Sequence, residues 1–170
     1  MPSIRYDRTN DCVKVVADDG GVIGRFEPRL IARQSADLVS DLDVVLSDLP
    51  GLTHDIEVGT YAFRIALQTL ATANGGLAVA FILTTAVLGE IDAIVRAYSA
   101  AAVACSRVTT ATSGTEFYGA NDAVTQLVVE GTFTVTTAGS IKLQACQDDS
   151  HADQTDVYEG STFEIVKIAD

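Results

Sequence analysis

The sequence is poor in the residue types on which most enzyme and metal chemistry depends. Its 170 residues include two histidines, three cysteines, three prolines, one methionine and no tryptophan. His54 and His151 are far apart, and no serine lies in a Gly-x-Ser-x-Gly element, so a hydrolytic triad is not indicated. We expect His54 to be a solvated loop residue. Cys12, Cys105 and Cys146 lack the Cys-x-x-Cys spacing of zinc ligands, so we expect buried, reduced thiols. The protein is therefore predicted to have no catalytic residues and no cofactor.

Positive charge and long apolar runs are also scarce. Eleven Lys and Arg residues oppose 23 Asp and Glu residues, which gives a formal net charge of −12. A field of this sign repels phosphate backbones, so nucleic acid is not an expected partner. The most apolar stretch, residues 77–88, is shorter than the ~18 to 20 residues that cross a bilayer. The N-terminus lacks the apolar run of a secretory signal. We expect synthesis in a cytoplasm and no membrane span.

What the sequence does contain is a series of short segments with apolar residues at every second position, the pattern of a half-buried strand. In residues 59–68 the alternating apolar positions, which we expect to face the core, are Tyr61, Phe63, Ile65 and Leu67. Residues 127–135 show the same alternation. After a turn at 137–140 it resumes in residues 141–145, which predicts a β-hairpin.

Further strands are predicted at residues 78–83 and 162–168. Together with residues 93–104 and two N-terminal runs, 12–16 and 22–26, they bring the total to about eight. Residues 36–49 and 93–104 fit either a helix or a strand, and we expect a loop to begin at Pro50-Gly51. Short strands separated by turn residues favour an all-β fold, an antiparallel β-sandwich or jelly roll.

The N-terminal segment contains two β-prone runs, residues 12–16 and 22–26, joined by Asp18-Asp19-Gly20-Gly21, which predicts a hairpin. This hairpin could be an edge of the main sheet or an arm that reaches a partner. We divide the chain into an arm, residues 1–35, and a sandwich domain, residues 36–170. The arm is locally basic and the rest is acidic, which would suit contacts between subunits. The candidate interface residues are Arg5, Arg8, Arg25, Phe26 and Arg29.

The segment from residue 147 to 156 gathers carboxylates and one imidazole. Asp148, Asp149, Asp153 and Asp156 are weak candidates for a site that holds a hard cation such as calcium, which prefers oxygen ligands. The central glycine and closing glutamate of an EF-hand loop are missing. The preferred interpretation is therefore a solvated hairpin loop without a metal.

The order of several motifs resembles a family of small jelly-roll virion proteins of tailed bacteriophages. The resemblance covers about the last 120 residues and lies in PGL at 50–52, GTYAFR at 59–64, TANGGLAV at 72–79, EGTFTV at 130–135, AGSIKLQ at 138–144 and YEGSTFEIVKI at 158–168. It implies a head-decoration (cement) or tail-associated protein, often trimeric, located on the capsid surface and bound to itself and to the major capsid protein. The alternative is a receptor- or carbohydrate-binding module that uses Tyr98, Tyr118 and Tyr158.

Overall fold

The computed structural model describes residues 3–7, 12–16, 22–26, 29–40, 44–100, 102–110, 112–120 and 123–170. Side chains are described from Arg29 onward within these ranges, except those of Val39 and Ser40. Every regular element in these ranges is a β-strand, which confirms the all-β prediction. No helix of membrane-spanning length and apolarity occurs in this part of the chain.

The strands form three antiparallel sheets. The first contains β1 (Ser3–Asp7), β2 (Cys12–Val16) and β3 (Val22–Phe26). The second has eight strands: β4 (Leu30–Arg33), β5 (Leu38–Ser40), β7 (Gly59–Leu70), β9 (Val87–Tyr98), β10 (Val103–Val108), β12 (Gln126–Thr137), β14 (Thr155–Val157) and β15 (Thr162–Ala169). The third has four: β6 (Ser47–Ile56), β8 (Leu77–Thr84), β11 (Glu116–Ala120) and β13 (Gly139–Cys146).

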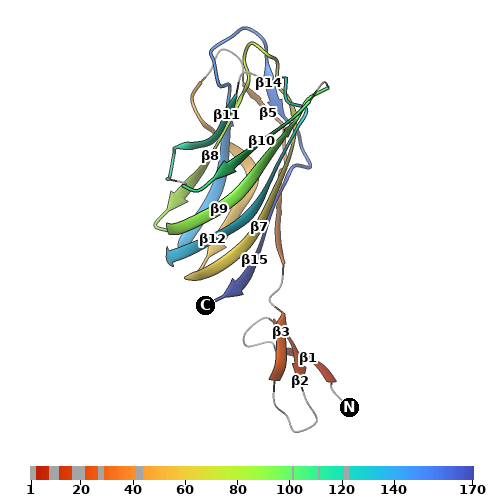
Figure 1. The fold of residues 1–170 in the computed structure, drawn as a ribbon, viewed down its shortest axis with the longest axis vertical. Helices are drawn as coiled ribbons and strands as arrows, with labels where there is room; N and C mark the ends of the chain where they lie inside the picture. The colour runs from red at the N-terminus through yellow and green to blue at the C-terminus, as the bar shows by residue number, and fades with distance from the viewer. Residues whose placement is uncertain are drawn as a thin grey trace.

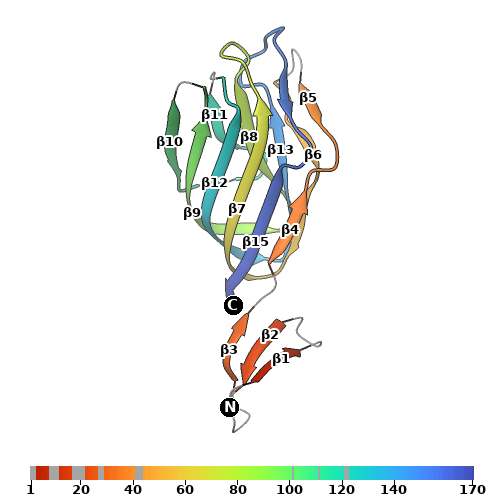
Figure 2. The same ribbon diagram turned by 90° about the vertical axis from the view of Figure 1, so that its right-hand side faces the viewer.

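The large and small sheets pack face to face as a sandwich with the order of a jelly roll (Figures 1 and 2). In the large sheet β4, β15, β7 and β12 are neighbours in that order, and in the small sheet the order is β6, β13, β8 and β11. These eight strands are the jelly-roll set. The β9–β10 pair, β14 and β5 are additions that widen the large sheet.

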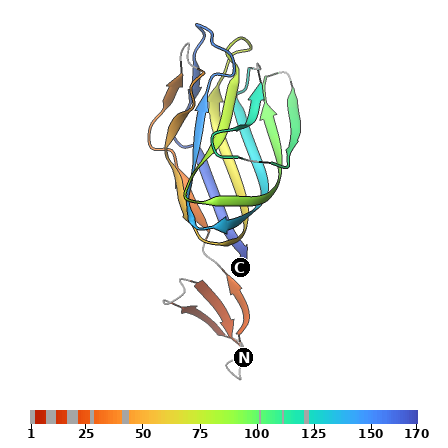
Figure 3. The same ribbon diagram turned by 90° about the vertical axis from the view of Figure 1, so that its left-hand side faces the viewer.

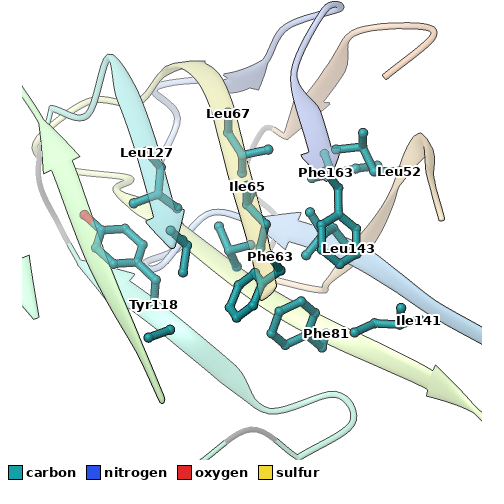
Figure 4. Packing of buried hydrophobic residues seen from close by; sticks show 14 of the residues in the cluster. Leu52, Phe63, Ile65, Leu67, Phe81, Tyr118, Leu127, Ile141, Leu143 and Phe163 are labelled. Carbon is teal, nitrogen blue, oxygen red and sulfur yellow. The ribbon is translucent and has the colours of Figure 1, made fainter. Parts of the chain in front are cut away.

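The core lies between the two sheets and is made by the alternating residues. Tyr61, Phe63, Ile65 and Leu67 of β7 are all buried, as predicted. Their neighbours across the core include Phe81 of β8, whose ring lies 6.1 Å from that of Phe63 in an edge-to-face arrangement (Figure 4). Such aromatic pairs add stabilisation beyond their buried area.

The predicted hairpin of residues 127–145 is wrong, although both of its strands exist. β12 pairs with β7 and β9, whereas β13 pairs with β6 and β8 in the other sheet. The chain therefore crosses from one sheet to the other between Thr137 and Gly139. Phe133 and Ile141 are buried, and a hairpin with one face on the core would be expected to bury them as well. Alternation alone does not distinguish the two.

The expected loop at Pro50-Gly51 is instead a bulge inside β6. Gln144 pairs with Asp48 and Lys142 pairs with Thr53, so the residues between Asp48 and Thr53 oppose a single residue of β13. Gly51 has φ +85°, and a Cβ there would lie 2.5 Å from the Arg33 carbonyl oxygen. β6 is an edge strand, where a proline removes no ladder hydrogen bond.

Both ambiguous segments are extended where the structure describes them. In residues 36–49 the strands are β5 and the start of β6, and in residues 93–104 they are the end of β9 and the start of β10. Ala93 and Ala97 are buried beneath the facing sheet. Here tertiary pairing outweighs the helix preference of alanine, which is a weak tendency.

The predicted N-terminal hairpin is present as β2 and β3, and β1 adds a third strand. This sheet is hydrogen-bonded into neither sheet of the sandwich, so the edge-hairpin alternative is wrong. It lies beyond the end of the sandwich that carries the C-terminus (Figures 2 and 3). The turn at 18–21 is outside the described residues. β4 pairs with β15, so the sandwich begins before the boundary expected at residue 35.

Candidate interaction surfaces

The histidine expected in a solvated loop is a buried residue of β6. The exposed fraction of His54 is 7%, and its Nε2 lies 2.7 Å from the carbonyl oxygen of Phe163. Burial lowers the pKa of His54 below its usual value, because an apolar environment disfavours the imidazolium. The prediction for His54 was wrong because it assumed that a loop begins at Pro50-Gly51. The structure has only a bulge there, and β6 continues through His54. His54 joins the two sheets and has no triad partner among the described residues.

The cysteines differ in environment. Cys146 is buried, as expected, but Cys105 is exposed on β10, which corrects the prediction for that residue. The strand that carries Cys105 is the last of the large sheet, so one side of it has no neighbour. The side chain of Cys12 is outside the described residues.

The acidic segment at residues 147–156 is organised by hydrogen bonds. The Gln147 side chain is fully buried and its Nε2 donates to the carbonyl oxygens of His151 and Asp153. The Asn74 amide donates to the Asp153 carboxylate, which lowers the pKa of that group. The loop is therefore built around a buried glutamine and is less solvated than expected.

The candidate metal ligands of this loop are not brought together. Burial raises the pKa of Asp148, and also that of Asp156, which lies in β14 rather than in the loop. In the described ranges no group of three or more His, Cys, Asp or Glu side chains is arranged to hold a metal ion.

The three tyrosines of the carbohydrate alternative do not form an exposed platform. Tyr118 is buried, and Tyr98 and Tyr158 are half-buried. Tyr98 lies on β9, Tyr118 lies on β11, and Tyr158 lies in the turn after β14. A sugar-binding site would require aromatic faces open to solvent, and this arrangement does not supply them.

The N-terminal sheet aligns three cationic residues in a single row. Arg5 of β1 is directly opposite Lys14 of β2, and Lys14 is directly opposite Arg25 of β3. Like charges in directly opposite positions destabilise a sheet unless a counter-charge is near. Phe26 is opposite Val13, and Arg8 lies outside the described residues. The row joins two of the predicted interface residues and adds Lys14, which sequence reasoning missed.

The remaining interface candidate, Arg29, lies at the start of the sandwich. It forms an ion pair with Glu164 of β15. Beside this pair is a shallow depression of about 230 Å³, lined by Arg29, Ala62, Phe63, Arg64, Glu164 and Val166. Ile31, on the adjacent β4, is 54% exposed. This part of the large sheet offers apolar surface next to the point where the N-terminal segment joins.

Charged residues on the outer face of the large sheet are paired across strands. Glu130 of β12 accepts hydrogen bonds from Arg96 of β9 at 2.7 Å and Arg64 of β7 at 3.1 Å. Both hydrogen bonds lower the pKa of Glu130, and the bond from Arg96 has the larger effect. The polar positions of 59–68 and 127–135 were evident from the sequence, but their pairing requires the strand order.

Comparison with known proteins gives a weak likeness to viral particle proteins. No protein family and no curated protein matches the sequence. The solved structures that resemble the fold include the VP2 subviral particle of infectious bursal disease virus, with 10% identity and a TM-score of 0.25, and the Gt strain of the same virus, with 11% identity and a TM-score of 0.24. Each alignment covers all of this chain and 47% of the other. This chain therefore spans about half the length of the proteins that it resembles.

Proposed function

We propose that this chain is a non-enzymatic structural protein of a virus particle that binds neighbouring protein chains through its N-terminal sheet. In its finer form, the proposal is a capsid decoration protein that assembles as a homotrimer and stabilises the shell by binding the major capsid protein. A tail-associated protein is the alternative location.

The observation that carries the proposal is the N-terminal sheet with its row of Arg5, Lys14 and Arg25. Three strands of five residues bury little surface and gain little stability without a partner. In the described ranges the strands of this sheet pair only with one another and with neither sheet of the sandwich. A protein partner with carboxylates opposite the row would add contacts to the sheet and counter-charges to the row.

The charge distribution supports contacts between copies of the chain. Residues 1–33 contain six Lys and Arg against five Asp and Glu, a net charge of +1. Residues 34–170 contain five against eighteen, a net charge of −13. A cationic row on one subunit is therefore complementary to the acidic body of a neighbour, and such complementarity favours encounter and orientation.

The test removes residues 1–28 and compares the mass in solution of the two chains by sedimentation velocity. We expect the full chain to form larger oligomers than the shortened chain, which should keep the β-sheet circular dichroism spectrum of the sandwich. A full chain that is monomeric at every concentration, or a shortened chain that assembles equally well, would refute the role of the sheet.

A second variant keeps the N-terminal sheet intact. Lys14→Glu places an anion between Arg5 and Arg25, so the charge of the row falls from +3 to +1 and its attraction to an acidic partner weakens. We expect weaker assembly. Arg33→Glu makes the same change of net charge at an exposed position of β4 and should leave assembly unchanged. The virion role is tested separately, by density-gradient purification of particles from cells that make the chain. Absence of the chain from the particles would refute it.

A further inference from the structure

One strand edge of the sandwich is left open. β10 is the last strand of the large sheet, and its residues Val103 to Arg107 are all exposed. It pairs with β9 over six consecutive residues with no shift of register. It contains no proline or glycine, and its one charged residue, Arg107, is held by Asp92 in two hydrogen bonds of 2.8 Å. The backbone groups on its outer side face no strand of the sandwich.

The other edges of the sandwich carry the features that normally block strand addition. β6 contains the bulge at Pro50-Gly51, and β11 has a shift of register next to Glu116. β5 has three residues and β4 has four. After β4 the chain turns to the small sheet, where the Ser35 amide donates to the Pro50 carbonyl oxygen at 3.0 Å. β10 is thus the longest regular edge of the sandwich.

The two sheets also fail to close on the β10 side. A depression of about 260 Å³ separates the edge strands and is lined by Ala104, Cys105, Ser106, Phe117, Tyr118, Gly119 and Ala120. Ala104 and Ser106 pair with the buried Ala97 and Val95, so they belong to the inner face of the sheet. Both side chains are small, and neither covers the edge.

We propose that β10 pairs antiparallel with β10 of a second copy of this chain, about a two-fold axis. The two large sheets would become one continuous sheet, with main-chain hydrogen bonds across the junction. Closed two-fold interfaces are the commonest in soluble oligomers, and they bring the same patch of both subunits together. This contact does not involve the N-terminal sheet, so it stands or fails independently of the function proposed above.

The register follows from the side chains. A two-fold axis normal to the sheet keeps outward residues opposite outward residues, so some residue must lie opposite itself. With Cys105 at the axis, Val103 of each copy lies opposite Arg107 of the other. The aliphatic part of Arg107 then covers Val103, which is 53% exposed in the single chain. With Ser106 at the axis, Val103 stays uncovered, and with Arg107 at the axis like charges meet.

The fit between two β10 strands in this register supports a second copy of the chain as the partner of the open edge. In the Cys105 register no two like charges are directly opposite, each exposed Val103 gains a cover, and small residues lie opposite small residues on the inner face. A strand from the N-terminal sheet of another copy would add a cationic residue, Arg5 or Arg25, to an edge that already carries Arg107. The edge is therefore better matched to itself than to that sheet.

The experiment uses Cys105 as a native probe in the full chain. Directly opposite residues of antiparallel strands have Cα atoms about 4.5 to 5.5 Å apart, within the range of about 4.4 to 6.8 Å that a disulfide spans. We expect mild oxidation to produce a covalent dimer, which Cys12→Ser and Cys146→Ser retain and Cys105→Ser abolishes.

The register is tested in the Cys105→Ser background. Val103→Cys and Arg107→Cys should each form no disulfide alone, but a mixture of the two variants should form a cross-linked pair. Equal cross-linking of each variant with itself, or none in the mixture, would overturn the proposed pairing.

A reversible measurement complements the cross-linking. Val103→Glu places a carboxylate opposite Arg107 of the second copy, and Val103→Lys places a like charge there. For two symmetric pairs we expect the dimer Kd to fall with Glu and rise with Lys, each by about two-fold to thirty-fold. Both substitutions are at an exposed position and should leave unfolding unchanged. A dimer Kd that does not change with the charge at position 103, or a chain that never dimerises, would refute the proposal.

Discussion

Replacement of His54 by phenylalanine should lower the stability of the sandwich and change how that stability depends on pH. A carbonyl oxygen only accepts hydrogen bonds, so the Nε2 atom of His54 must carry the proton donated to Phe163. The imidazole ring also packs edge-on against the Phe163 ring, with 4.9 Å between centroids. Phenylalanine preserves most of the ring packing and removes the donor.

The expected loss at neutral pH is that of a buried carbonyl left without its partner, about 1–3 kcal/mol. The pH dependence has a definite sign. The pKa of His54 is lower in the folded chain than its ordinary value of 6.5, so the unfolded chain binds more protons as the pH falls below that value. Its contribution to stability is present above pH 6.5 and is lost as the pH falls through the folded pKa, at up to about 1.4 kcal/mol per pH unit.

The assay is urea unfolding followed by circular dichroism at a series of pH values between 7.5 and 5. The gap between wild type and His54→Phe should be largest at pH 7.5 and narrow toward pH 5. Ile141→Val, a buried change without a titrating group, should cost about 0.5–1.5 kcal/mol at every pH. A gap that stays constant or widens on acidification would refute the assignment of a buried, neutral His54.

Four further substitutions test the packing and the surface pairs. Phe81→Ala should cost about 3–5 kcal/mol in urea unfolding, and Phe117→Ala should cost less, because the Phe117 ring is only half-buried. Gly131→Ala should cost about 1–3 kcal/mol through overpacking, since its Cβ would lie 2.6 Å from that of Ala93. Glu130→Gln should cost less than about 1 kcal/mol, because its ion pairs are partly exposed, and added salt should shrink the difference.

The sequence predicted which residues form the core but not how the strands connect. Alternation identified the inner face of β7 because each strand has its own period of two, a local property. The crossing between β12 and β13 is not local. Phe133 and Ile141 would be buried either in a hairpin or in two facing sheets, so only the pairing partners decide between them.

The surface features were less accessible to sequence reasoning. Cys105 was expected to be buried because the cysteine spacing indicated neither a zinc site nor a disulfide framework, yet its exposure depends on β10 being the last strand of its sheet. The row at Lys14 likewise depends on the register of three strands. The sequence shows which residues are charged or small. It does not show which of them lie on an edge strand or opposite one another, because that depends on pairing between distant segments.

The position of β15 sets the order in which the sandwich is completed. This strand follows all the others along the described chain and lies between β4 and β7, so β4 has no neighbour in the large sheet until β15 has been synthesised. Few strands next to each other in sequence pair with each other, and such non-local topologies fold slowly. A nascent chain would hold β4 and one side of β7 unprotected until β15 emerges, so the docking of β15 is the step that covers both strands.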